Sequence, residues 1–255
     1  MKISIITVTY NSEKTLEDTI SSVLNQNYED LEYILVDGAS KDNTINIINS
    51  FQKKYPQKLK YISEKDYGIY DAMNKGIRMA TGDIIGILNS DDIFNDNFVL
   101  TDIIRAFSNN IDAICGNLKF VRKNNVNSTV RVWKGSPYKS FSKGWHPAHP
   151  TFYVRKRIYD NYGVYDTSFN VSADFELMLR LIEINHINIR YLNRDIVKMR
   201  IGGESTCSLI NIYKGNKNII KAFNKNKIKV SYLYPIYRLT PKILSLIKFL
   251  ILSKH

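Results

Sequence analysis

Apolar and polar positions follow one another in blocks along the first half of the chain, and these blocks predict strands and helices in turn. Short, β-branched apolar runs typical of buried strands occupy residues 3–8, 33–36, 59–62, 84–88 and 113–115. Apolar residues at helical spacing occupy residues 13–26, 45–51, 69–80 and 98–107. This alternation predicts an α/β fold, a doubly wound and mostly parallel sheet with helices on both faces.

The second half of the chain is less regular. Residues 118–133 are basic and partly alternating, which indicates a hairpin or an extended loop, and residues 134–150 form an irregular stretch rich in Gly, Pro, Ser and aromatics. Later strands are expected at 151–154, 187–192 and 196–201, with a helix beginning at Asp174. We expect one domain over 1–205, with halves 1–117 and 118–205, followed by a helical tail over 206–255.

Polar side chains stand at the ends of three predicted strands. Thr9, Asp37 and Asp91 each follow an apolar run, so a parallel sheet would bring them to one edge, where α/β folds bind their ligands. The segment Asn89-Ser90-Asp91-Asp92 offers two adjacent carboxylates, which suit a Mg²⁺ or Mn²⁺ ion bridged to phosphates. By itself this segment is equally typical of a solvated turn with a helix cap.

Positive charge is concentrated at the end of the chain. The 255 residues carry a net charge of +12; no acidic residue follows Glu204, and nine Lys with Arg238 lie in 205–255. The apolar run 243–252 is too short to span a bilayer, which needs about twenty residues. A basic, apolar terminal helix suits an anionic membrane surface; packing on the protein body or on a partner subunit is the alternative. Two distant cysteines and a start unlike a signal peptide favour the cytoplasm.

Four segments resemble, in order, the motifs of glycosyltransferase family 2, nucleotide-sugar-dependent enzymes with a GT-A fold. They are residues 7–11, 36–44, 66–76 and 89–92, and weaker similarity continues at 149–152 and 172–177. The resemblance is greatest to bacterial enzymes that build lipopolysaccharide, capsule and exopolysaccharide. It implies a hexosyltransferase-type enzyme that uses a UDP- or GDP-sugar and a saccharide or lipid-linked acceptor.

The resemblance also implies roles for individual residues. Donor-binding residues would be Thr9, Tyr10, Asn11, Asp37, Asp66, Asp71, Asn74, Lys75, Asn89, Ser90 and Asp91. Asp91, supported by Asp92, would hold the metal, and Asp174 would be the general base of an inverting transfer. Trp145 and His149 would line the acceptor site. Gly202, Gly203 and Ser205 resemble a lid that closes over the diphosphate, and the same residues are equally typical of a simple turn.

The chain departs from the family pattern at three points. Asn89 replaces the first Asp of the DxD motif, so only a neutral oxygen is offered there, and Ala173 stands where many members have Glu. The QxxRW motif of processive synthases is absent, which implies transfer of single sugars.

Simpler structural explanations exist for several of these residues. Asp37 before Gly38 is typical of a turn, Asp71 near a helix start favours the helix dipole, and Asp174 suits an N-cap. Trp145 suits a core position as well as a sugar platform. A nucleotidyltransferase and a nucleic-acid-binding protein using the basic tail are the competing functions. The preferred prediction is a glycosyltransferase on the inner face of the cell membrane, without nucleic acid, and with a homodimer as a candidate assembly.

Overall fold

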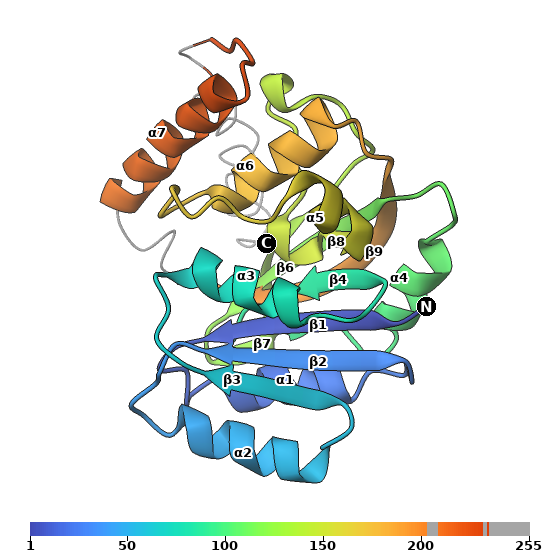
Figure 1. Cartoon of the computed structure of the whole chain (residues 1–255), viewed down its shortest axis with the longest axis vertical. Helices are drawn as coiled ribbons and strands as arrows, with labels where there is room; N and C mark the ends of the chain where they lie inside the picture. The colour runs from blue at the N-terminus through green and yellow to red at the C-terminus, as the bar shows by residue number, and fades with distance from the viewer. Residues whose placement is uncertain (203–208, 232–233, 235–255) are drawn as a thin grey trace, which may run out of the picture.

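The computed structural model of the chain describes residues 1–202, 209–231 and 234 (Figure 1). One sheet of nine strands runs through this described part, with the order β3-β2-β1-β4-β8-β6-β9-β5 and with β7 paired to β6. Helices lie on both faces of the sheet, as the alternating sequence pattern predicts.

The first half of the sheet is entirely parallel. It consists of β1 (Ile3–Thr9), β2 (Leu31–Asp37), β3 (Leu59–Ser63) and β4 (Ile84–Ile87). Thr9 pairs in register with Asp37, and Asp37 pairs with Ser63. The last residues of three strands therefore lie side by side at one edge.

The second half of the sheet mixes both directions. It contains β5 (Ile93–Phe94), β6 (Ala113–Arg122), β7 (Asn125–Trp133), β8 (Tyr153–Arg155) and β9 (Ile189–Arg200). β8 is antiparallel to both β4 and β6, while β9 runs parallel to β6. β6 and β7 form the hairpin expected over 118–133, so the expected division at residue 117 falls inside β6.

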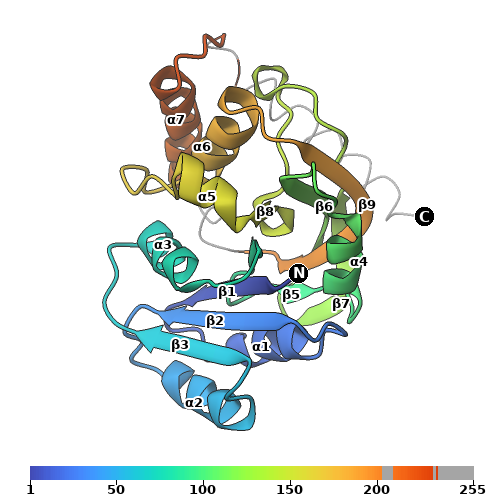
Figure 2. The same cartoon turned by 45° about the vertical axis from the view of Figure 1, so that its right-hand side comes forward.

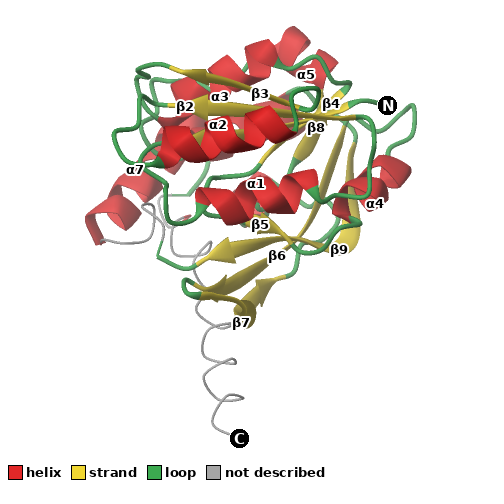
Figure 3. Ribbon diagram, turned by 90° about the horizontal axis from the view of Figure 1, so that it is seen from below, coloured by secondary structure: helices red, strands yellow, loops and turns green. Residues whose placement is uncertain are grey.

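The helices form two layers (Figures 1 and 3). Residues of α1 (Leu16–Leu24), α2 (Thr44–Lys54) and α4 (Val99–Ala106) join the apolar core on one face. Residues of α3 (Ile69–Met79), α5 (Lys156–Tyr162), α6 (Ala173–Leu179) and α7 (Leu209–Lys225) join the core on the other.

Successive side chains of each strand point to opposite faces of the sheet, so each strand contributes to both apolar cores. Along β1, Ile5 packs on the α1 face and Ile6 on the α3 face, and both are fully buried. Burying each such side chain stabilises the fold by roughly 1.5–3 kcal/mol. The irregular stretch 134–150 runs through one 3₁₀ turn at Phe141–Lys143 and enters a second at His149–Thr151.

The prediction of two separate strands at 187–192 and 196–201 is wrong, because β9 is continuous. The polar triplet Asn193-Arg194-Asp195 suggested a break. In the fold Arg194 pairs with Asp96 at 2.6 Å and with Asp102 at 2.8 Å. The register with β6 shifts around this point, so a bulge accommodates the polar residues without ending the strand.

Helix α7 lies within the predicted tail and packs its apolar side on α6 (Figure 2). Phe223 is fully buried, with its ring 5.5 Å from that of Phe175 on α6. This first part of the tail therefore shares the core of the domain. The apolar run 243–252 lies outside the described residues. Among the described helices, none combines the length and the apolarity needed to cross a bilayer.

Candidate active site

Asp37 lies where the sequence predicts, at the end of β2, but its partners are protein groups. It is fully buried, and its carboxylate accepts bonds from the Ser40 backbone N–H at 3.0 Å, from the Ser40 hydroxyl and from Ser63 Oγ at 2.7 Å. These bonds use most of the acceptor capacity of a carboxylate. Asp37 therefore shapes the loop that follows β2 and has little capacity left for a ligand.

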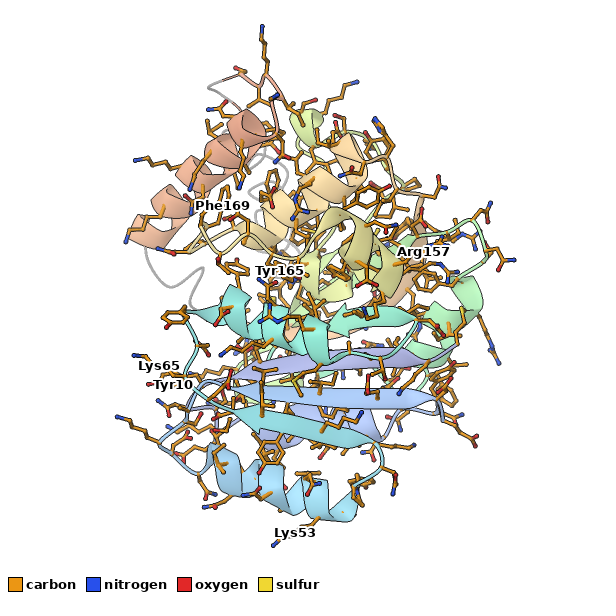
Figure 4. The ribbon with its side chains drawn as sticks, viewed as in Figure 1. Tyr10, Lys53, Lys65, Arg157, Tyr165 and Phe169 are labelled. Atoms are coloured by element: carbon orange, nitrogen blue, oxygen red, sulfur yellow. The ribbon has the colours of Figure 1, made fainter. Side chains whose placement is uncertain are left out.

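Tyr10, Gly38 and Asp66 meet beside that loop. A Cβ atom at Gly38 would lie 2.4 Å from Asp66 Oδ2 and 3.4 Å from the Tyr10 ring, so both side chains lie against Gly38. The Tyr10 side chain is 60% exposed, and Figure 4 places it with Lys65 at the same end of the sheet. The exposed ring can stack on a nucleotide base, and the Asp66 carboxylate can accept a hydrogen bond from that base. Asn11 shapes the same edge by accepting from the Lys41 N–H at 2.9 Å.

The polar residues of α3 are engaged with the protein. Asn74 is buried and makes two bonds to the backbone of Tyr165, at 2.8 and 2.9 Å. The Lys75 ammonium lies 2.8 Å from Glu64 and 3.6 Å from Asp71. The arrangement does not support the expected contacts of Asn74 with ribose and of Lys75 with phosphate. Asn74 instead ties α3 to the segment that precedes α6.

Buried acceptor oxygens gather after β4. Asn89 Oδ1 and Asp92 Oδ1 are buried and have no hydrogen-bond partner among the described residues, as is also true of Thr9 Oγ1. Burial, and then the charge of Asp91, raises the pKa of Asp92 well above its usual range. A divalent cation would offset both effects, and oxygen donors of this kind suit Mg²⁺ or Mn²⁺.

The described chain offers no cluster of three or more His, Cys, Asp or Glu side chains for a metal. A cation at Asp91 would therefore need ligands from outside the protein. Mg²⁺ is commonly held in this way, by one or two carboxylates together with substrate phosphates. The residues at 89–92 thus fit a metal that binds together with a phosphorylated ligand.

Asp174 is the second residue of α6. Its Oδ1 accepts a hydrogen bond from the Tyr70 hydroxyl on α3 at 3.2 Å. The N-cap position belongs to Ser172, whose backbone is left-handed with φ of 67°, so the alternative role of Asp174 as the N-cap is wrong. Tyr70 also stacks on Tyr165, with ring centroids 5.6 Å apart.

His149 belongs to the same cluster. Its Nε2 lies 2.6 Å from the Tyr165 hydroxyl. Burial lowers the pKa of His149, against the opposing effect of the nearby Asp174 charge. A neutral imidazole beside the candidate base can exchange hydrogen bonds with a hydroxyl ligand.

Trp145 stands in an aromatic wall rather than alone. Its ring packs edge-on against Tyr138 and Phe141, and its N–H donates to Ser136 Oγ at 3.1 Å. Glu183 secures this wall by accepting from the Tyr138 hydroxyl at 2.7 Å. Glu183 lies on the π-helical turn Arg180–Ile184 that continues α6, a local distortion frequent at functional sites.

The sequence reasoning passed over three residues of the site, Tyr70, Tyr165 and Glu183. Tyr70 lies inside the motif at 66–76, and this was the one feature of the local sequence that pointed to it.

Of the predicted lid, Gly202 has a left-handed backbone with φ of 99°, a conformation that favours glycine. Gly203 and Ser205 lie outside the described residues.

The chain is similar in sequence to known glycosyltransferases. The family model for glycosyl transferase family 2 matches residues 4–171. An uncharacterized glycosyltransferase of Nostoc is 33% identical over 129 residues, covering 48% of this chain and 40% of its own. A mycobacterial PGL/p-HBAD biosynthesis glycosyltransferase (Mycobacterium bovis) is 27% identical over 195 residues, covering 74% and 73%. The chain thus spans less than half of the Nostoc relative and most of the mycobacterial one.

Two solved structures share the fold. TarS 1–349 of S. aureus, in complex with UDP, has a TM-score of 0.65 at 20% identity, covering 90% of this chain and 67% of its own. The mannosyltransferase PcManGT of Pyrobaculum calidifontis, with GDP-Man and Mn²⁺, has a TM-score of 0.65 at 19% identity, covering 92% and 68%. The expected GT-A fold is confirmed, and with a family match over more than half its length, this chain belongs to glycosyl transferase family 2.

Proposed function

We propose that this protein is an inverting, non-processive glycosyltransferase that moves one sugar from a nucleotide-sugar to a saccharide or lipid-linked acceptor. The observation that carries the proposal is the buried carboxylate oxygen of Asp92, next to Asp91, which has no hydrogen-bond partner among the described residues. Carboxylates in this position, at the carboxyl ends of parallel strands, suit a divalent cation that binds together with a diphosphate.

The donor base would bind at the contact of Tyr10, Gly38 and Asp66. The exposed Tyr10 ring offers a stacking face, and Asp66 Oδ2 lies against the same glycine, Gly38. Asp66 Oδ1 is already occupied by the Gly68 N–H at 2.9 Å, which orients the carboxylate. The solved relatives that bind UDP and GDP-Man support a uridine or guanosine donor, without deciding between them.

The metal would be held by Asp91, with Asp92 behind it and Asn89 offering a neutral oxygen. When bound, a Mg²⁺ or Mn²⁺ ion supplies positive charge that stabilises the diphosphate as it leaves. The Mn²⁺ in the mannosyltransferase structure supports this assignment.

Asp174 would act as the general base. The acceptor hydroxyl oxygen forms a bond to the anomeric carbon, the bond from that carbon to the diphosphate oxygen breaks, and its electron pair leaves with the nucleoside diphosphate. The hydroxyl proton passes to Asp174. One displacement of this kind inverts the anomeric centre. Tyr70, by donating to Oδ1, holds the carboxylate so that its second oxygen can face the acceptor.

The acceptor would lie against His149 and the aromatic wall that contains Trp145.

The family resemblance and the basic end of the chain support a role in cell-surface polysaccharide synthesis at the inner face of the membrane. On α7, Lys214, Lys217, Lys221 and Lys225 are exposed and recur at helical spacing, while Ile219 and Phe223 face the core. Lys225 pairs with Asp166 and Lys221 lies over the Phe169 ring, so Lys214 and Lys217 are the two best placed for anionic lipid headgroups, at about 1 kcal/mol each.

The enzyme proposal is tested with UDP- and GDP-sugars in the presence and absence of Mn²⁺. We expect at least one donor to raise the melting temperature, more strongly with the metal than without it, and to be slowly hydrolysed only when the metal is present. No stabilisation by any donor would contradict the proposal. Release of pyrophosphate from a nucleoside triphosphate would instead favour the nucleotidyltransferase, and salt-dependent affinity for RNA or DNA would favour the nucleic-acid-binding protein.

The membrane part is tested separately by co-sedimentation with phosphatidylglycerol and phosphatidylcholine vesicles. We expect the double variant K214Q/K217Q to lose binding to the anionic vesicles several-fold. The control K53Q/K54Q removes the same charge from α2, at the opposite end of the molecule in Figure 4. Equal loss in both variants would show that only the total charge matters.

A further inference from the structure

Arg200 ends β9 and is almost completely buried, with 5% of its surface exposed. Its guanidinium donates to three partners: the Asp91 carbonyl at 2.6 Å through Nη1, the Asp18 carboxylate through Nη2 and the Lys123 carbonyl at 3.3 Å through Nε. One side chain therefore joins the loop after β4 to α1 and to the turn between β6 and β7.

Three successive carbonyl oxygens of the loop after β4 are held by side chains. Thr15 donates to the Ser90 carbonyl at 2.8 Å, and Thr19 donates to the Asp92 carbonyl at 2.8 Å. Arg200 holds the carbonyl between them. These three hydrogen bonds fix the backbone of residues 90–92. The Asp91 and Asp92 side chains therefore start from a backbone that is held by groups which are not themselves metal ligands.

Arg200 differs from the two threonines in its origin. Thr15 and Thr19 belong to the start of α1, close to the loop in the same half of the sheet, whereas Arg200 comes from β9 in the other half. Arg200 therefore ties the loop after β4 to the second half of the sheet.

We infer that Arg200 is a positioning residue for the metal site, setting the aim of the Asp91 carboxylate through the Asp91 backbone. This inference rests on the proposed function, since it concerns the same cation. It depends on the shape of the guanidinium, because each of the three acceptors is reached by a different nitrogen of one rigid plane, whereas a lysine side chain has a single nitrogen. Lysine at 200 would keep the charge but not these three bonds, so R200K separates geometry from charge.

The test measures Mn²⁺ affinity by electron paramagnetic resonance on purified full-length protein, with and without UDP, together with metal-free UDP affinity and melting temperature. We expect R200K to weaken Mn²⁺ binding about tenfold, as is usual when a residue supporting a metal ligand is changed. Metal-free UDP affinity should stay unchanged. The control is R190K, on the same strand, where the exposed Arg190 donates to the Ala106 carbonyl at 2.6 Å.

A second variant covers the case in which R200K does not fold. D18N weakens the hold on Nη2 and leaves the Asp91 contact in place, and the Asp18 side chain is 61% exposed, so the fold should tolerate it. We expect D18N to weaken Mn²⁺ binding by a smaller factor, about threefold. Wild-type Mn²⁺ affinity in R200K, or in D18N if R200K is unfolded, overturns the inference.

The variant D91N separates this inference from the proposed function. If D91N keeps full Mn²⁺ affinity, the metal site has been assigned wrongly and the proposed function fails at that point. If D91N loses Mn²⁺ while folded R200K retains it, the metal site stands and only the role of Arg200 is wrong. A loss of metal-free UDP binding in R200K equal to its loss of Mn²⁺ binding would also reject a role confined to the metal loop.

Discussion

The hydroxyl of Tyr70 on α3 donates to Asp174 Oδ1 on α6 at 3.2 Å, across 104 residues of sequence. This contact joins the half of the domain that carries the first three parallel strands to the half that carries the candidate base. Tyr70 stacks on Tyr165, and Tyr165 in turn contacts His149. The candidate base is thus held by an aromatic cluster drawn from both halves.

Replacing Asp174 by Asn should abolish transfer while leaving donor binding intact. The amide keeps the shape of the side chain but cannot take the proton, and loss of a general base costs roughly 10²–10⁴-fold in rate. Transfer assays and donor titration of D174N measure the two effects. D160N, on the exposed surface of α5, serves as the control. A D174N protein that binds no donor would reject the role of a base.

Replacing Tyr70 by Phe should lower kcat by about tenfold with little change in donor KM. The ring keeps its stacking on Tyr165, and only the hydrogen bond to a charged acceptor is lost, at about 1.5–3 kcal/mol. Steady-state kinetics of Y70F and the wild type measure the change in kcat and in donor KM. In the control Y61F the lost hydroxyl bonds Asn49, away from Asp174, and kcat should not move. Equal effects in both variants would mean a general loss of stability.

Replacing Gly38 by Ala should weaken donor binding. The new methyl group would lie 2.4 Å from Asp66 Oδ2, so the carboxylate must shift from its present position. Overpacking of this kind costs about 1–3 kcal/mol, which corresponds to a roughly 5- to 150-fold higher Kd. Calorimetry with the donor tests it. The control G215A places its methyl 3.5 Å from Ser172 Oγ, an ordinary contact in α7, and should bind donor normally.

Because of Glu32, the free energy of unfolding should fall as the pH is lowered into the acidic range. Burial opposes its ionisation, but hydrogen bonds from Ser4, Thr81 and Lys60 prevail and lower its pKa from 4.5 to about 2. Because the pKa is lower in the folded protein, this stabilisation is complete above pH 4.5 and is lost as the pH falls toward 2. It amounts to as much as about 3 kcal/mol.

Urea unfolding of wild type and E32Q from pH 7 to pH 3 measures this contribution. E32Q should be less stable at pH 7 and should show a shallower loss of stability in acid. E29Q, an exposed glutamate at the same edge, should behave as the wild type. An identical slope in E32Q and wild type would show that other carboxylates account for the acid sensitivity.

Local pattern predicted much of the first half of the fold. The apolar runs at β1, β2, β3 and β4 are short, β-branched and separated by helical repeats, and each became a parallel strand. Burial on both faces requires such runs, so the pattern and the structure have one cause. The meeting of Thr9 with Asp37 at one edge followed from the same reasoning.

Local pattern failed where long-range ion pairs compensate for polarity. β9 was predicted as two strands because Arg194 and Asp195 interrupt its apolar run. Its continuity depends on Asp96, Asp102 and Lys119, which lie about 75 to 100 residues earlier in the chain. No window of sequence around β9 contains those partners.

Short-range periodicity and motifs in a set order were enough to predict the family, the doubly wound sheet and the position of the acidic segment after β4. The folded structure was needed to show which polar groups are already satisfied by the protein. Asn74 binds the backbone of Tyr165, whereas Asp92 Oδ1 has no hydrogen-bond partner in the described part of the chain. Hydrogen-bond satisfaction depends on groups brought together from distant parts of the chain, and a buried polar atom reveals its need for a ligand only when those neighbours are in place.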